Sequence, residues 1–446
     1  MQYFKPSIYN VFIEQDKEYT TIFNSFSGGI IKLENEIYTV LKNGLFTKNQ
    51  INYFDELIKG GYIVLKDIDE YRRVYILHEN YNMNPNPTTV SYVLVPTLNC
   101  NLRCVYCFQK NYTRNKSGEI FSKGAMTSII DFIVQENQGN TNLRNIKINW
   151  FGGEPLLCFE SIILFYEQLS DRLSEKNISI KTGITTNGVL LNEERLILLK
   201  NKCNLEKIQI TVDGEEKTYC TKKQTTTDTF NKVLENIYLS TKYVRTVVRL
   251  NADKSNFEEL KRLALLIKHK AEKENLILHF AQLRNYTNDE NVNNVYFNDY
   301  EYWVAKKEFY QTLKNSGQDQ KNLTRKLPSF SFNSFCGLVA KQNYVIDYKG
   351  NLFKCEHQIG DEKYCVGNIK YGLFYNDIYQ NAVKLSNDVK CKQCNLFPCC
   401  NYAQCNIMHN FAGKKKCMIY ENQLLVLQSK VKEYLQNLQT EGHHGN

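Results

Sequence analysis

The stretch Asn99-Cys-Asn-Leu-Arg-Cys-Val-Tyr-Cys-Phe108 follows the apolar segment 90–96 and decides the fold. It brings three cysteines, Cys100, Cys104 and Cys107, to the end of an expected strand. A cubane iron–sulfur cluster has four irons and normally takes four protein thiolates, so three cysteines hold three irons and leave one open to another ligand. The sequence therefore predicts a cluster with one exchangeable position, which indicates chemistry at iron.

Two other interpretations of the three cysteines stay open. Structural zinc usually takes four ligands in two pairs, but no histidine or fourth cysteine lies within twenty residues of this group, and the nearest candidate is His78. A loop that is rich in cysteine without binding anything is the other interpretation. Ligand number and spacing favour the cluster over both.

The pattern Cys-x3-Cys-x2-Cys, with Tyr106 before the third cysteine, resembles the signature of the radical S-adenosylmethionine (SAM) superfamily. The resemblance implies that SAM binds the open iron of a [4Fe-4S] cluster through its amino and carboxylate groups. Reductive cleavage then gives a 5′-deoxyadenosyl radical that abstracts hydrogen from a substrate. The same resemblance implies an electron donor such as flavodoxin or ferredoxin.

Length and cysteine usage favour a cytoplasmic enzyme of several domains. The 446 residues are 42% hydrophobic, enough for two or three packed domains. The chain shows no apolar signal core and no apolar run long enough for a membrane helix. Twelve of the 15 cysteines fall into two groups, at 100–107 and 336–417, which indicates metal or cluster ligation more than disulfides.

The net charge does not indicate nucleic-acid binding. A charge of +9, from 56 basic and 47 acidic residues, is a small surplus, and the basic residues are scattered. The densest run of basic residues, 414–416, is typical of a solvated face. An acidic peptide partner is the alternative interpretation.

From residue 90 the sequence alternates apolar runs with amphipathic segments, which predicts an α/β fold with six βα units, a partial (β/α)6 TIM-like barrel. Asn256, followed by Phe-Glu-Glu, is a predicted helix N-cap. Ligands of parallel sheets bind at the carboxyl ends of the strands. The predicted strands are 90–96, 146–151, 178–186, 208–212, 246–251 and 277–283. The predicted helices are 123–135, 159–173, 192–199, 229–241 and 257–273.

Polar and glycine-rich motifs follow several of these strands. Gly152-Gly153-Glu154-Pro155 follows the second strand, where glycines let a ligand approach the backbone closely, although the same motif alone suits an ordinary turn. Its place about 45 residues after the cysteines resembles the superfamily motif that binds the amino group of SAM. By the same resemblance, later strand ends meet the ribose and carboxylate of SAM. The implied contacts there are Asn187, Thr211 and Asn251.

The C-terminal cysteines resemble the SPASM domain, which holds two auxiliary [4Fe-4S] clusters in relatives that mature peptides and proteins. Residues 345–351 predict a hairpin with Gly350 at its turn. A pair of zinc knuckles is the alternative, since Cys-x2-Cys also suits zinc. Carried over by position, one cluster takes Cys336, Cys355 and Cys405, and the other takes Cys391, Cys394, Cys400 and Cys417.

Two departures from the SPASM pattern leave ligands open. The gap before Cys405 is four residues where three is usual, so Cys399 can replace Cys400. Residues 337–354 contain no cysteine, so the first auxiliary cluster has Cys365 as its fourth ligand, or an open iron. An open iron could bind a substrate cysteine and lower its thiol pKa.

The first ninety residues contain no cysteine and predict a separate module. A small sheet is indicated by the alternating runs 10–13, 20–23 and 30–33. Two helices are indicated at 36–41 and 50–59, followed by the apolar run 62–65. This order is winged-helix-like. The module resembles elements that bind leader peptides of ribosomally made, modified peptides as an added strand. A merely structural cap is the alternative.

Together the resemblances imply a radical SAM maturase of a precursor peptide with a leader, with no nucleic-acid or membrane partner. The expected reaction is a thioether or carbon–carbon crosslink. A sulfatase-type maturase that oxidises one Cys or Ser is the second hypothesis, and a non-catalytic iron–sulfur or zinc-binding module is a distant third. The expected domains are 1–85 (leader recognition), 86–315 (barrel), 316–430 (SPASM) and 431–446 (tail).

Overall fold

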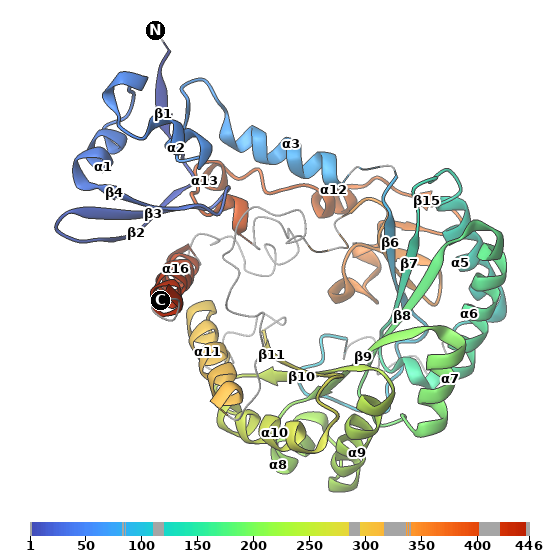
Figure 1. Cartoon of the computed structure of the whole chain (residues 1–446). Coiled ribbons are helices and arrows are strands. Elements are labelled where there is room, and N and C mark those ends of the chain that lie inside the picture. The colour runs from blue at the N-terminus through green and yellow to red at the C-terminus, as the bar shows by residue number, and fades with distance from the viewer. Residues whose placement is uncertain are drawn as a thin grey trace.

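Parallel strands form the inner layer of an open barrel, and helices form its outer layer (Figure 1). A smaller N-terminal module lies beside the barrel and next to the C-terminal helix. The structure is a computed structural model that describes residues 2–82, 84, 86–109, 120–284, 295–315, 336, 338, 340–400 and 420–442.

The six predicted barrel strands are confirmed, with ends that differ by at most three residues. They pair in parallel and in chain order, because each connection crosses back over one face of the sheet. The result is an α/β fold with a large, mostly parallel sheet. The strands are β6 (Thr89–Val95), β7 (Asn145–Trp150), β8 (Ser179–Thr186), β9 (Leu205–Val212), β10 (Arg245–Ala252) and β11 (Leu276–Gln282).

The five predicted barrel helices are also confirmed. Asn256 precedes the last of them, as predicted, but its side chain does not cap the helix: its amide donates to the carbonyls of Asp213 and Asn251 instead. The confirmed helices are α5 (Lys123–Glu136), α6 (Phe159–Leu173), α7 (Glu193–Cys203), α9 (Thr227–Tyr243) and α10 (Phe257–Lys270). Two helices that were not predicted are α8 (Glu216–Lys223) and α11 (Asp299–Asn315).

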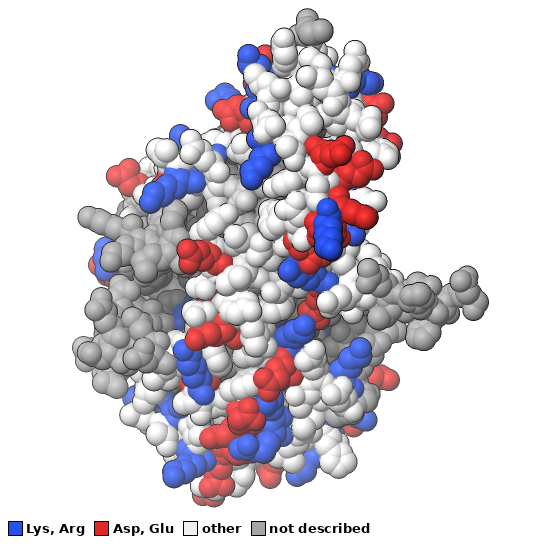
Figure 2. Space-filling view, turned by 90° about the vertical axis from the view of Figure 1, so that its left-hand side faces the viewer, with Lys and Arg blue, Asp and Glu red and all other residues white. Residues whose placement is uncertain are grey.

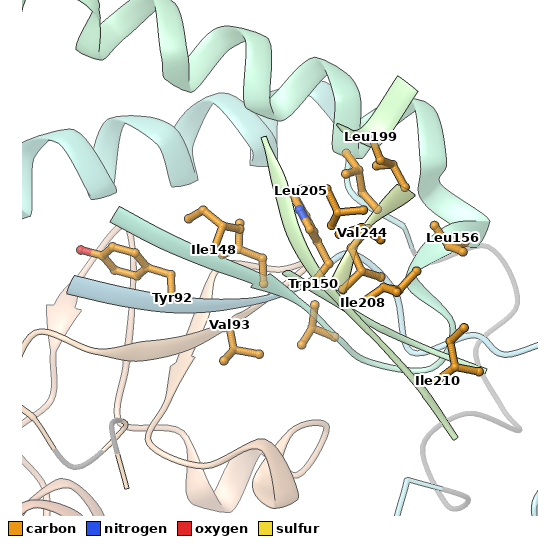
Figure 3. Packing of buried hydrophobic residues seen from close by; sticks show 14 of the residues in the cluster. Tyr92, Val93, Ile148, Trp150, Leu156, Leu199, Leu205, Ile208, Ile210 and Val244 are labelled. Atoms are coloured by element: carbon orange, nitrogen blue, oxygen red, sulfur yellow. The ribbon is translucent and has the colours of Figure 1, made fainter. Parts of the chain in front are cut away.

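Alternation along the strands divides the barrel into two faces. Tyr92, Ile148 and Trp150 are buried under the helical layer, whereas Val93 lies on the other side of its strand (Figure 3). The even-numbered positions of β8 are likewise buried, while Lys181, Gly183 and Thr185 are only partly covered. The odd-numbered face of these strands therefore lines the inside of the barrel.

The predicted C-terminal hairpin is confirmed as β12 (Tyr344–Asp347) and β13 (Asn351–Phe353). Gly350 has a φ of +80°, and a Cβ there would lie 2.7 Å from the Ile369 side chain, so the turn requires glycine. Strand β12 pairs in parallel with β6 and extends the barrel sheet. The segment continues through β14 (Gly367–Asn368), β15 (Gly372–Leu373), α12 (Asp377–Val383) and α13 (Val389–Lys392).

The N-terminal module contains the predicted strands and two helices in the predicted order, with β1 before them and α3 after them as elements that were not predicted. Its strands form two small sheets, one of three strands in the order β2-β3-β4 and one that pairs β1 with β5. Its elements are β1 (Phe4–Pro6), β2 (Asn10–Gln15), β3 (Tyr19–Asn24), β4 (Ile30–Glu34), α1 (Asn35–Lys42), α2 (Phe54–Lys59), β5 (Ile63–Leu65) and α3 (Glu70–Asn82).

Helix α16 (Tyr420–Gly442) joins this module to the rest of the chain. Leu427 and Val431 of α16 are buried against Val11, Ile13 and Phe23 of the small sheet. The expected tail, 431–446, is therefore corrected: a helix occupies residues up to 442, because the apolar positions of α16 cover the sheet. Residues 443–446 lie outside the described part of the chain.

Acidic and basic side chains are intermixed on the face that carries the N-terminal module and α16 (Figure 2). This face presents no continuous field of one sign to a charged polymer. Among the helices in the described ranges, none is long and apolar enough to span a bilayer.

Shortening Leu427 tests the contact between α16 and the module. Leu427 is 3% exposed, so Leu427→Ala is expected to cost about 3 kcal/mol and to raise hydrogen exchange in β2 and β3. Leu425 is 44% exposed, so Leu425→Ala is the matched control and should leave exchange unchanged. Equal exchange in both variants would contradict this packing.

Candidate active site

The three cysteines of the 99–108 loop, which we call the claw, line one cavity at the carboxyl ends of the barrel strands. The cavity has a volume of about 280 Å³, and each of the three thiols is half-buried. Within the described ranges, no three His, Cys, Asp or Glu side chains converge closely enough to hold a single metal ion. Six other predicted site residues line the same cavity: Tyr106, Gly152, Gly153, Asn187, Thr211 and Asn251.

The Gly152-Gly153 turn packs against the backbone of the claw loop. A Cβ at Gly153 would lie 2.1 Å from the Asn99 carbonyl oxygen, and one at Gly152 would lie 2.5 Å from that of Thr97. The Glu154 amide also donates to the Asn99 carbonyl at 2.8 Å. Glycine is therefore needed here for the approach of one protein loop to another.

Glu154 lies behind the cavity and does not line it. Its carboxylate is fully buried and accepts hydrogen bonds from the Thr186 hydroxyl at 2.7 Å and from the backbone amide of Asn187 at 2.8 Å. The Asn187 side chain in turn donates to Cys100 Sγ at 3.7 Å. Glu154 thus orients the strand end that contacts the claw, and its predicted contact with SAM stays a prediction.

A buried ionic network lies under the other end of the claw. The Tyr106 hydroxyl donates to Asp213 Oδ2 at 2.5 Å, and Lys223 Nζ lies 3.0 Å from the same oxygen. The Asn251 amide donates to the Tyr106 hydroxyl at 3.3 Å. Burial opposes charge on Lys223, but Asp213 raises its pKa well above the usual value, so the lysine stays charged.

Helix α8 also holds the claw through its backbone. The Val105 amide donates to the Lys222 carbonyl at 2.9 Å, and the Arg103 amide donates to the Lys223 carbonyl at 3.3 Å. Sequence reasoning missed Lys223, because a short polar helix with a low apolar content carries little periodic signal.

The far wall of the cavity brings together polar and charged residues that were not predicted. Arg284 follows β11, while Glu356 and His357 follow Cys355 in the C-terminal segment. Phe108 of the claw loop contacts the His357 ring, with centroids 4.7 Å apart. Their position directly after a predicted ligand was the signal that could have identified Glu356 and His357.

Three of the predicted auxiliary ligands pack against one buried apolar cluster. Cys391, Cys394 and Cys400 all contact the buried cluster that contains Phe397. The buried Cys399 thiol donates to the Leu396 carbonyl at 3.5 Å and lies close enough to Cys400 and Cys394 for their charges to raise its pKa further after burial. Cys336 and Cys355 are described, with Cys336 exposed and Cys355 partly buried. Cys405 and Cys417 lie outside the described residues.

The donor set fits a thiolate-bound cluster with a polar ligand. Burial raises the pKa of Cys100 to about 12, so without a metal this thiol is protonated at neutral pH. A bound cluster would favour the thiolate, and the Asn187 amide is placed to donate to it. Thr211, Asn251 and Arg249 supply further polar groups to the lining of the cavity.

Gly153→Ala is expected to displace the claw loop. Because the added Cβ meets backbone atoms, we expect a loss of stability of about 1 to 3 kcal/mol and a lower iron content after anaerobic reconstitution. Gly139→Ala is the control, since a Cβ at that position would have no atom within 4 Å. Normal iron content in Gly153→Ala would contradict the close approach.

Lys223→Met removes the cation beside the buried Asp213. The uncompensated carboxylate is expected to cost about 3 to 5 kcal/mol, measured by urea unfolding. Adding Asp213→Asn should recover much of this loss, because the buried charge is then removed while an amide oxygen remains for Tyr106. A double variant no more stable than Lys223→Met would argue against the pairing.

Comparison with known proteins agrees with this geometry. Residues 94–267 match the family model of the Radical SAM superfamily. A cysteine-type anaerobic sulfatase-maturating enzyme of Clostridium novyi is 26% identical over 333 residues, 68% of this chain and 84% of that protein. The radical SAM cyclopropyl synthase TigE of Paramaledivibacter caminithermalis is 30% identical over 209 residues, 40% of this chain and 43% of that protein.

Two solved structures share the fold. The structure of native anSMEcpe with bound AdoMet and Cp18Cys peptide has a TM-score of 0.59 at 18% identity, covering 79% of this chain and 100% of that one. Streptococcus suis SuiB bound to S-adenosylmethionine has a TM-score of 0.51 at 15% identity, covering 89% of this chain and 94% of that one. Residues 94–267, which contain the claw, therefore match the Radical SAM superfamily in sequence, and the barrel shares its fold with these two structures.

Proposed function

We propose that this chain is a radical SAM enzyme that installs a thioether or carbon–carbon crosslink in a ribosomally made precursor peptide. The observation that carries the proposal is that the segment after Cys355 forms a wall of the claw cavity. A substrate in this cavity would lie between the claw and a predicted auxiliary site. That arrangement suits a reaction in which a substrate loses both a hydrogen atom and an electron.

Cys100, Cys104 and Cys107 would hold a [4Fe-4S] cluster, with SAM on its open iron. When bound, the pair would supply a 5′-deoxyadenosyl radical after an electron arrives from a donor such as flavodoxin or ferredoxin. Asn187 would donate a hydrogen bond to the Cys100 thiolate. Tyr106, held by Asp213, would keep the third cysteine oriented, and Thr211 and Asn251 would contact SAM from the opposite strands.

Thioether formation replaces one C–H and one S–H bond of the peptide by a C–S bond. One hydrogen atom leaves to the adenosyl group, and one proton and one electron leave separately. Predicted auxiliary clusters would accept that electron. We assign one to Cys336, Cys355 and Cys405, and the other to Cys391, Cys394, Cys400 and Cys417.

The choice of Cys400 over Cys399 rests on packing. Cys400 packs against the same buried apolar cluster as Cys391 and Cys394, whereas Cys399 lies near Cys394 and Cys400 but does not pack against that cluster. Cys365 donates to the Gly367 carbonyl at 2.9 Å, so its role as a fourth ligand would require that bond to break. An open iron that binds a substrate cysteine is the simpler proposal.

The N-terminal module, residues 1–85, is the proposed leader-binding domain, followed by the barrel at 86–315 and the SPASM domain at 316–430. The support is a groove of about 720 Å³ between the small sheet and α16. Strand β4 is an edge of that sheet, and Ile30 and Lys32 on β4 line the groove. An edge strand beside a groove suits a leader bound as an added strand in a winged-helix-like domain.

A sulfatase-type maturase is the second candidate, because the curated relative from Clostridium novyi has that description. Such an enzyme would oxidise one Cys or Ser and form no crosslink. The groove beside the N-terminal module favours the first candidate, because a sulfatase-type maturase needs no leader.

The proposal predicts how a precursor peptide encoded beside this chain reacts. Reconstituted enzyme, SAM and reductant are expected to remove two hydrogens from the full-length peptide, and tandem mass spectrometry should show no fragmentation between the linked residues. The leaderless peptide should react at least about tenfold more slowly, because it lacks the added-strand contacts.

The same assay separates the candidates. Oxidation of a single Cys or Ser at equal rates with and without the leader would favour the sulfatase-type maturase. Absence of 5′-deoxyadenosine from SAM would overturn both candidates.

A further inference from the structure

Four neighbouring strands each carry a basic residue four positions before a residue that lines the claw cavity. Since side chains alternate along a strand, residues four apart lie on the same face. The basic side chains therefore lie on the inner face of the barrel, below the cavity. The pairs are Lys147 on β7 and Phe151 directly after it, Lys181 and Thr185 on β8, Lys207 and Thr211 on β9, and Arg245 and Arg249 on β10.

We call these four basic residues the basic ring. Lys147 lies directly opposite Lys181, and Lys207 lies directly opposite Arg245. Like charges in directly opposed positions destabilise a sheet. Lys181 is paired with Glu206 at 2.8 Å, but none of the described carboxylates lies within ion-pair distance of the other three. The ring therefore exposes positive charges whose mutual repulsion destabilises the sheet, and a bound anion would relieve that repulsion.

The wall between the ring and the cavity is also positive. Arg249 lies opposite His279 on the neighbouring strand. Burial, and after it the positive charges of Arg249, Lys306 and Lys207, lower the pKa of the His279 imidazole to about 4. Glu356 is a nearby carboxylate. Burial raises its pKa, and the positive charges of Arg249 and Lys207 act in the opposite direction. One carboxylate against several cations leaves an excess of positive charge.

We propose that the basic ring binds carboxylate side chains of the peptide whose modified residue lies in the claw cavity. The proposal deepens the proposed function and rests on it. A strand rises about 3.3 Å per residue, so the ring lies about 13 Å from the cavity-lining residues. An extended peptide advances at the same rate, which places its Asp or Glu about four positions from the modified residue.

The carboxylate of SAM is another anion that the barrel would bind. SAM bound at the claw lies at the carboxyl ends of the strands, whereas the ring lies near their amino ends. An anion bound at the ring should therefore bind equally well with and without SAM.

Fluorescence anisotropy on the full-length protein tests the inference. The probes are fluorescein-labelled nonapeptides of Gly and Ser that carry three Glu, three Gln or three Lys residues. We expect the Glu probe to bind about tenfold more tightly than the Gln probe at low salt, with a smaller preference at physiological salt. Lys147→Gln/Lys207→Gln should abolish the preference.

Lys176→Gln/Lys200→Gln is the matched control, because it removes the same charge from exposed positions outside the barrel. It should keep the preference within about twofold. Equal binding of the Glu and Gln probes, an unchanged preference in the ring variant, or an equal loss in the control would each overturn the inference. SAM cleavage is measured separately on the same samples, so a failure of the proposed function is distinguishable from a failure of the ring.

Discussion

A single buried carboxylate, Asp213, determines how the claw is held on the barrel. It lies at the end of β9 and bonds to Tyr106 within the claw and to Lys223 at the end of α8. Its own backbone carbonyl accepts from Asn256, which precedes α10. Four segments thus meet at one residue. Because its buried charge must keep its partners, the claw and α8 cannot move independently of the end of β9.

The apolar periodicity of the sequence was sufficient to predict the barrel. Six strands and five helices follow directly from alternating apolar runs, because burial of one face leaves a regular pattern. Helix α8 was missed because it is polar, and the part of α16 after residue 430 was taken for a tail because buried positions such as Val431 are few in it. Both helices are defined by contacts with distant segments, which a local pattern does not record.

At the candidate site, the sequence was sufficient to predict many of the residues but not what each of them contacts. Motif spacing identified nine residues that line one cavity, but it could not show that Gly152 and Gly153 face the claw backbone or that Glu154 lies behind the wall. Lys223, Arg284 and His357 were not found, since each becomes relevant only through the packing of a segment far away in the sequence. The three-dimensional arrangement adds an electrostatic character that the net charge of +9 did not reveal.

The parallel pairing of β12 with β6 has a consequence for how the chain assembles. The Ser91 amide donates to the Asn343 side chain across 252 residues of sequence. During synthesis one edge of the first barrel strand therefore stays unpaired until the C-terminal hairpin emerges, and closing so long a loop is slow. The claw directly follows that strand, so the claw is synthesised long before the sheet beside it can be completed.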